Sequence, residues 1–194
     1  MLKFIKDFLI YGFASVIGKI AAVFLMPIYT SVLTQEEYGA MALITSAKGI
    51  IDLFSNLNIH SGVARDYKED GIDKTKLVST GLFSILGISL TVFALLACSQ
   101  SFWQETVLSL DSRFSTAFFI MLLSIPAGST LSYFSVLTRF KREPILYSVG
   151  TIVQLLIQIL VSVVGVVYLH YGIASIFVGI LSSICTGLLN AAES

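Results

Sequence analysis

Two long stretches without charge limit what this chain can fold into. Residues 77–104 and residues 144–192 contain no Asp, Glu, Lys or Arg. A helix rises about 1.5 Å per residue and the hydrocarbon core of a bilayer is about 30 Å thick, so the second stretch is far too long for one spanning helix. It must fold back on itself, and the natural turn is His170-Tyr171-Gly172. The chain is therefore expected to cross a membrane several times.

Composition supports lipid as the natural solvent. Only 12% of the residues are charged and 56% are hydrophobic, whereas an ordinary soluble domain has about 25% charged residues. We predict an all-α, polytopic membrane protein in which residues 1–194 form one bundle of six transmembrane helices. The predicted helices cover about residues 8–33, 38–64, 77–99, 115–138, 145–169 and 171–189.

Lysines and arginines outside these helices are sorted to one side. Nine of them lie at the N-terminus and in the segments 65–76 and 139–142, whereas the opposite side has only Arg113. Segments next to transmembrane helices are enriched in Lys and Arg on the cytoplasmic side. We therefore expect a multi-pass protein of the inner (plasma) membrane with both termini in the cytoplasm.

The second predicted helix has a polar stripe. Lys48, Asp52, Asn56 and His60 follow one another at intervals of four residues, which places them on one helix face. Lys19 is expected at a similar depth in the first predicted helix. A charge at the bilayer midplane costs roughly 2.5–3.5 kcal/mol on insertion scales, and such groups usually face protein or water. The stripe is therefore expected to face inward.

Two interpretations of these charges remain open. One is an ion pair between Lys48 and Asp52 that only offsets the cost of its own burial. The other is a binding site for an anion such as a phosphate. Because one acid cannot neutralise both Lys19 and Lys48, the sequence favours the anion site.

The fifth predicted helix has a milder polar face. Gln154 and Gln158 are four residues apart and share that face. Amides in a membrane either form hydrogen bonds between helices or line a wet cavity. The sequence leaves both interpretations open for these two glutamines.

Motifs for catalysis or for metal binding are missing from the sequence. There is no HExxH, P-loop, G-x-S-x-G or GxGxxG motif, and Cys98 and Cys185 lie alone in apolar stretches. We therefore expect no enzyme, no catalytic residues, no metal, no cofactor and no nucleic-acid partner.

Three segments together resemble a known family. They are PIYTSVLTQEEYGAMAL at 27–43, NIHSGVARDY at 58–67 and RFKREPILYSVGTIVQ at 139–154. With them the chain resembles the N-terminal lobe of the polysaccharide biosynthesis or O-antigen flippases. These belong to the superfamily of multidrug, oligosaccharidyl-lipid and polysaccharide exporters.

The resemblance implies a transport function. Family members flip an oligosaccharide linked to polyprenyl pyrophosphate across the membrane for the synthesis of polysaccharides such as lipopolysaccharide O-antigen. They use two helical lobes around a cavity with cationic residues, and Lys19, Lys48 and Arg65 are the matching positions here. The implied partners are membrane lipid, the lipid-linked oligosaccharide and a second six-helix lobe. Since family members have about twice as many spans, the chain is expected to be one lobe or a fragment.

We therefore predict flipping of this lipid-linked substrate. The alternatives are a multidrug or cation antiporter lobe, which should have a surplus of acidic cavity residues, and a fragment or scaffold that does not transport. The predicted substrate-binding residues are Lys19, Lys48, Asp52, Asn56, Arg65, Gln154 and Gln158.

Overall fold

The computed structural model describes the chain from residue 16 onward, with gaps. The described residues are 16, 19–20, 23–67, 71, 73–140, 144–168 and 171–192. Every regular element among them is helical, which confirms the predicted all-α fold. The predicted extent of the first helix, residues 8–33, lies partly outside the described residues, which show an apolar helix at Val23–Val32.

Six α-helices and three shorter helical turns follow. The α-helices are α2 (Gln35–Asn56), α3 (Ile59–Asp66), α4 (Lys74–Cys98), α5 (Ser115–Phe140), α6 (Pro144–Val163) and α7 (Ile173–Ala192). The shorter turns are the π-helical η1 (Phe102–Val107) and η3 (Val164–Tyr168) and the 3-10 turn η2 (Ser112–Phe114).

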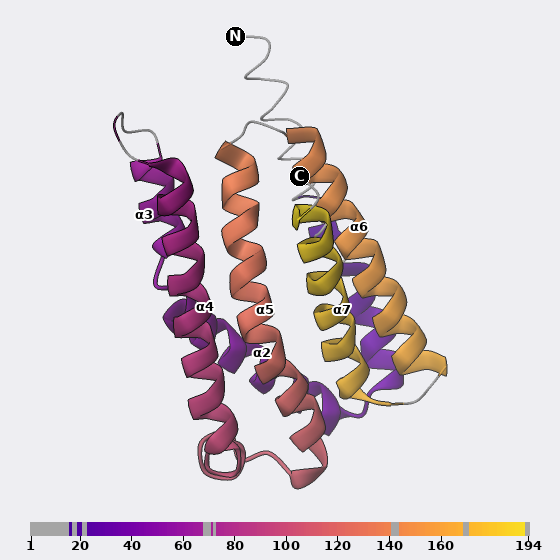
Figure 1. Cartoon of the computed structure of the whole chain (residues 1–194). Coiled ribbons are helices and arrows are strands. Elements are labelled where there is room, and N and C mark those ends of the chain that lie inside the picture. The colour runs from indigo at the N-terminus through magenta and orange to yellow at the C-terminus, as the bar shows by residue number, and fades with distance from the viewer. Residues whose placement is uncertain are drawn as a thin grey trace.

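Helices α4 to α7 run alternately up and down, and α2 crosses obliquely behind α5 and α4 (Figure 1). The most extensive contacts are those of α7 with α5 and α6, followed by those of α4 with α5. Helix α2 packs on α5, α4 and α7. The larger hydrophobic core lies between these helices and includes Ile44 of α2, Phe118 and Leu122 of α5, and Phe177 of α7.

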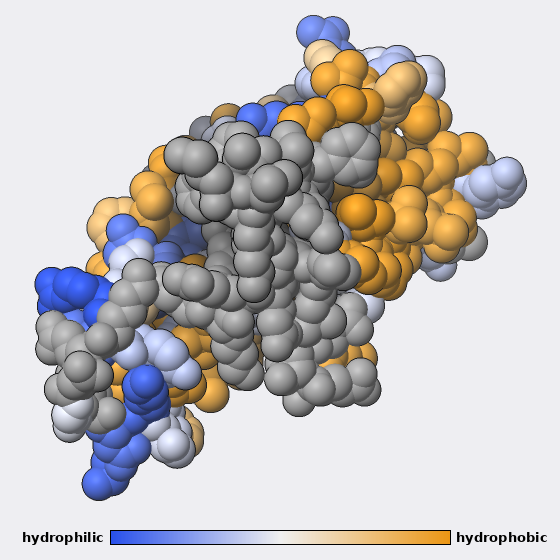
Figure 2. All heavy atoms as spheres, turned by 90° about the horizontal axis from the view of Figure 1, so that it is seen from above, coloured by the Kyte–Doolittle hydropathy of each residue, from blue (hydrophilic) through white to orange (hydrophobic). Residues whose placement is uncertain are grey.

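The surface differs from that of a soluble protein, and the interior contains buried serines beside its hydrophobic core. Large apolar side chains are open to the outside, with Phe24 70% and Leu53 73% exposed. Serines such as Ser55, Ser89 and Ser162 are buried. Figure 2 shows hydrophobic residues over a broad flank, with hydrophilic residues gathered toward one edge. Since soluble monomers rarely expose apolar patches on this scale, the exterior suits lipid.

Three described helices are long and apolar enough to cross a membrane. They are Lys74–Cys98, Ser112–Thr138 and Ser148–Tyr168. The prediction of six spanning helices is therefore confirmed for three. The apolar segments Val23–Val32 and Ile173–Leu189 are shorter than a full span.

The predicted continuous helix at 38–64 is wrong, because the structure divides it into α2 and α3. Leu57 and Asn58 lie between them in the left-handed region, with φ of 41° and 53°. Residues other than Gly, Asn and Asp seldom adopt this conformation, so Leu57 gives no signal in the sequence that the helix breaks there. The break redirects the chain toward the start of α4.

The N-terminus of α2 is fixed by a capping box. The side chain of Thr34 accepts a hydrogen bond from the backbone N–H of Glu37, and Glu37 Oε2 accepts one from the backbone N–H of Thr34 (2.9 Å). This reciprocal pair satisfies two backbone donors that the helix leaves open. The capping box therefore starts α2 at Gln35, three residues before the predicted boundary.

Gly81 and Gly87 of α4 offer a matched test of the packing. A Cβ at Gly81 would lie 2.6 Å from Val63 Cγ2 and 2.7 Å from the Tyr133 hydroxyl, whereas a Cβ at Gly87 would meet nothing within 4 Å. The Tyr133 hydroxyl is also held by its hydrogen bond to the Val78 carbonyl (2.6 Å). Gly81 thus lets α3, α4 and α5 approach closely.

We expect Gly81→Ala to destabilise the bundle by about 1–3 kcal/mol, the usual cost of overpacking. Gly87→Ala should be neutral or slightly stabilising, because alanine favours helix more than glycine does. Thermal unfolding of both variants in the same detergent checks this. Equal midpoints for the two variants would contradict the described contact of α4 with Val63 and Tyr133.

Candidate functional site

The polar stripe of α2 opens into a cavity between α2, α5 and α7. The cavity has a volume of about 380 Å³, and Lys48, Asp52 and Asn56 form its α2 wall. Residues of α5 and α7 form the rest of the lining: Gly128, Leu131, Ser132, Ser135, Val136 and Ile184. The structure therefore brings together three of the seven predicted site residues.

Lys48 and Asp52 form a close ion pair in this wall. Lys48 Nζ donates to Asp52 Oδ2 over 2.6 Å, one helical turn apart. The Lys48 side chain is only 16% exposed and that of Asp52 34%, so the pair is more sheltered than a surface ion pair. Losing one partner would leave the other as an uncompensated charge, which is the costly case for a sheltered pair.

Asn56 continues the wall by one turn. Its Nδ2 donates a hydrogen bond to the backbone carbonyl of Asp52 (2.9 Å). Its Oδ1 is buried and accepts no hydrogen bond from the residues that the structure describes. A buried acceptor without a hydrogen-bond donor is costly.

Ser132 and Ser135 are site residues that the sequence analysis missed. Together with Gly128 they give the α5 wall of the cavity small and partly polar side chains. The signal was present, because residues 128, 132 and 135 are spaced to share one face of a helix. Only the packing of α2 against α5 shows that this face meets the charged stripe.

The remaining predicted residues lie elsewhere. Lys19 is exposed and does not line the cavity, so the expected surplus of positive charge is absent from its lining. Arg65 is exposed on α3, where its Nε lies 3.1 Å from Asp66 Oδ1. His60, which follows the break between α2 and α3, is also outside the lining.

The two glutamines of α6 lie at helix contacts rather than in the cavity lining. A Cβ at Gly187 of α7 would lie 2.5 Å from Gln154 Nε2, so this amide fills the space that the glycine leaves. The backbone carbonyl of Gln158 similarly approaches Gly179 of α7. Both glutamines thus lie where α6 packs on α7, which favours helix packing over a wet cavity for Gln154.

A comparison with family models decides the broad identity. The model described as polysaccharide biosynthesis protein matches residues 4–192. The chain belongs to this family. Comparisons with curated proteins and with solved structures found no match.

Membership of the polysaccharide biosynthesis protein family indicates a role in polysaccharide synthesis or export at a membrane. The apolar exterior and the three helices of spanning length agree with a membrane location. No group of three or more potential metal-ligating side chains occurs among the described residues. The lining of the cavity has charged and hydrogen-bonding side chains.

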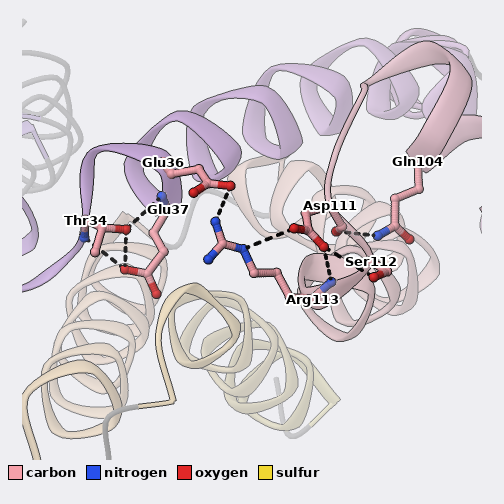
Figure 3. Close-up of polar contacts among 7 residues, drawn as sticks. All are labelled: Thr34, Glu36, Glu37, Gln104, Asp111, Ser112 and Arg113. Atoms are coloured by element: carbon pink, nitrogen blue, oxygen red, sulfur yellow. Dashed lines mark hydrogen bonds and ion pairs between the residues drawn. The ribbon is translucent and has the colours of Figure 1, made fainter.

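At the end of the bundle where α2 begins, this polysaccharide biosynthesis protein has a second polar cluster (Figure 3). Arg113 of η2 forms an ion pair with Glu36 of α2, and Arg113 Nε also lies 3.8 Å from Asp111 Oδ2. Gln104 donates a hydrogen bond to the Asp111 carbonyl (3.0 Å). The cluster ties the start of α2 to the segment that leads into α5.

Asp111 also caps η2. Its Oδ1 accepts a hydrogen bond from the backbone N–H of Arg113 (3.1 Å), and this bond lowers the pKa of the carboxyl group. A lowered pKa in the folded state means that Asp111 stabilises the fold above the ordinary carboxyl pKa of about 3.9. That stabilisation is lost as the pH falls through the lowered pKa.

We expect Asp111→Ala to lower the thermal unfolding midpoint at pH 7, and the difference from wild type to shrink as the pH falls through the lowered pKa of the wild-type carboxyl group. Asp111→Asn retains an acceptor oxygen without the charge. Its unfolding midpoint at pH 7 should lie between those of the wild type and of Asp111→Ala. The midpoints in detergent across this pH range are the measurement. A difference that persists unchanged into acid would show that Asp111 acts by packing rather than by charge.

Proposed function

We propose that this chain forms one lobe of a membrane flippase that moves an oligosaccharide linked to polyprenyl pyrophosphate for polysaccharide biosynthesis. The observation that supports this most directly is the sheltered Lys48–Asp52 pair, which lines an open cavity between three helices of a bundle with an apolar exterior. The family match supports the polysaccharide pathway. Charged groups at membrane depth usually mark a substrate or ion path.

The cavity lining suits the phosphate end of such a lipid. Lys48 supplies a positive charge, and the hydroxyl groups of Ser132 and Ser135 can donate hydrogen bonds to phosphate oxygens. Leu131, Val136 and Ile184 give the same cavity an apolar side for the polyprenyl chain. A second lobe is proposed as the opposite wall, because alternating access requires two units that move against each other around the site.

The distribution of charge suggests the orientation. Arg65, Lys74 and Lys76 lie at the α3 end of α4, whereas Arg113 at the other end is paired with Glu36. By the positive-inside rule, the α3 end faces the cytoplasm. With alternating spans this also gives the proposed cytoplasmic location of both termini in the inner (plasma) membrane.

A cation or drug antiporter lobe is the second candidate, and one observation favours it. The Asp52 side chain is more exposed than that of Lys48, so an entering cation could reach the carboxylate. The two candidates make opposite demands on the pair. A flippase for an anionic lipid needs Lys48, whereas a cation antiporter needs Asp52.

The test of the proposed function introduces Lys48→Ala into the native gene and measures surface polysaccharide. We expect at least a tenfold loss of polysaccharide per molecule of this protein in the membrane, because the cationic partner for phosphate is gone. Lys76→Ala is the matched control, since this lysine is highly exposed at the end of the bundle, and it should leave the polysaccharide unchanged. Wild-type polysaccharide in Lys48→Ala would overturn the proposed role of the cavity.

The orientation is tested separately by cysteine labelling. In a background with Cys98 and Cys185 replaced by serine, single cysteines are placed at Gln35 and at Lys76. A maleimide that cannot cross membranes should label Gln35→Cys in intact spheroplasts and Lys76→Cys only after permeabilisation. The reverse labelling pattern would contradict the proposed orientation.

A further inference from the structure

The cavity contains its own counter-ion for Lys48. Asp52 lies 2.6 Å from Lys48 Nζ on the same helix face, and both side chains line the cavity. An anion that enters therefore meets a lysine that is already neutralised. To gain Lys48 as a partner, the anion must displace the Asp52 carboxylate, and the cavity would then contain two negative groups and one positive group.

No other lining residue can balance that extra charge. The α5 wall consists of Gly128, Leu131, Ser132, Ser135 and Val136, the α7 wall of Ile184, and α4 contributes no lining residue. Within this described lining, Lys48 and Asp52 are the titratable groups. Uncompensated charge inside a membrane protein is costly, so the balance has to be restored within the pair or from the aqueous phase.

The proton on Asp52 also needs a hydrogen-bond acceptor. A protonated carboxyl group has an O–H to donate. The phosphate that takes the place of Asp52 beside Lys48 enters the same cavity wall, and its oxygens can accept this hydrogen bond.

We infer that the cavity binds a phosphate anion together with one proton: the phosphate replaces Asp52 as the partner of Lys48, and Asp52 takes up a proton from water. This inference rests on the proposed function and adds its regulation. No covalent bond changes, and one phosphate group with a single negative charge plus a proton leaves the net charge of the cavity as it was; the second phosphate group of the pyrophosphate linkage is not part of this balance. Asp52 thus serves as an internal substitute for the phosphate while the cavity is empty.

The test uses a phosphate whose own charge does not change near neutral pH. Farnesyl methyl phosphate, a diester that is singly charged from acid to alkaline pH, is titrated into the full chain in nanodiscs of zwitterionic lipid between pH 6 and pH 8. If binding takes up one proton, the affinity of the wild type for this diester should fall by up to about tenfold for each unit by which the pH rises. A wild-type affinity that is independent of pH would overturn the inference.

Asp52→Asn isolates the proton. This isosteric variant cannot ionise, so its affinity should be independent of pH and should at pH 8 exceed that of the wild type, because Lys48 has lost its competitor. Asp73→Asn, which alters an exposed ion pair with Lys76, should retain the wild-type slope. If the affinity of Asp52→Asn depended on pH as steeply as that of the wild type, the inference would be wrong.

Lys48→Ala separates this inference from the proposed function. Loss of binding at every pH in Lys48→Ala, together with an unchanged slope in Asp52→Asn, would leave the phosphate site standing and reject only its coupling to a proton. Wild-type binding in Lys48→Ala would reject both. Size-exclusion profiles identify variants that have not folded, and for these Lys48→Met, which keeps the length of the side chain without its charge, and Asp52→Ser replace the first choices with the same expected outcomes.

Discussion

The absence of water around the bundle is the constraint on which the rest of the structure depends. With apolar side chains on the outside, each polar group of the helices needs a partner inside the protein. Many serine and threonine side chains meet this need by donating hydrogen bonds to carbonyls three or four residues earlier, although Ser129 and Ser162 have no such partner among the described residues. Ser55 donates to Ile51 (2.9 Å), Ser124 to Met121 (2.6 Å) and Thr130 to Pro126 (2.8 Å). The helices can therefore bury serine between them at little cost.

The same constraint explains why Lys48 and Asp52 are one turn apart. In a pair within one helix, each charge has its partner one turn away, so the cost of burial is offset locally and no partner on another helix is needed. This leaves the opposite wall of the cavity free of charge, and α5 supplies only small or apolar side chains there. A ligand that enters from the α5 side can then compete with Asp52 for Lys48.

Local patterns in the sequence predicted part of this arrangement. Uncharged stretches indicated the apolar helices, and the four-residue spacing placed Lys48, Asp52 and Asn56 on one face. The break at Leu57 has no glycine or proline to mark it, and the left-handed conformation there falls on a residue that disfavours it. The position of Lys19 outside the lining and the role of Ser132 and Ser135 depend on how helices cross, which spacing along one helix does not encode.

The break and the small residues of α5 together explain why a cavity exists at this place. Since α2 ends at Asn56, the stripe ends there, and His60 leaves the face that Lys48 and Asp52 share. Opposite this short stripe, a Cβ on Gly128 would have only Ile184 in contact, at 3.7 Å, so the backbone of α5 is open at that level. Larger side chains at positions 128, 132 and 135 would fill the space by which a ligand reaches Lys48. The cavity thus depends on the absence of large side chains at these three positions of α5 as much as on the charged side chains of α2.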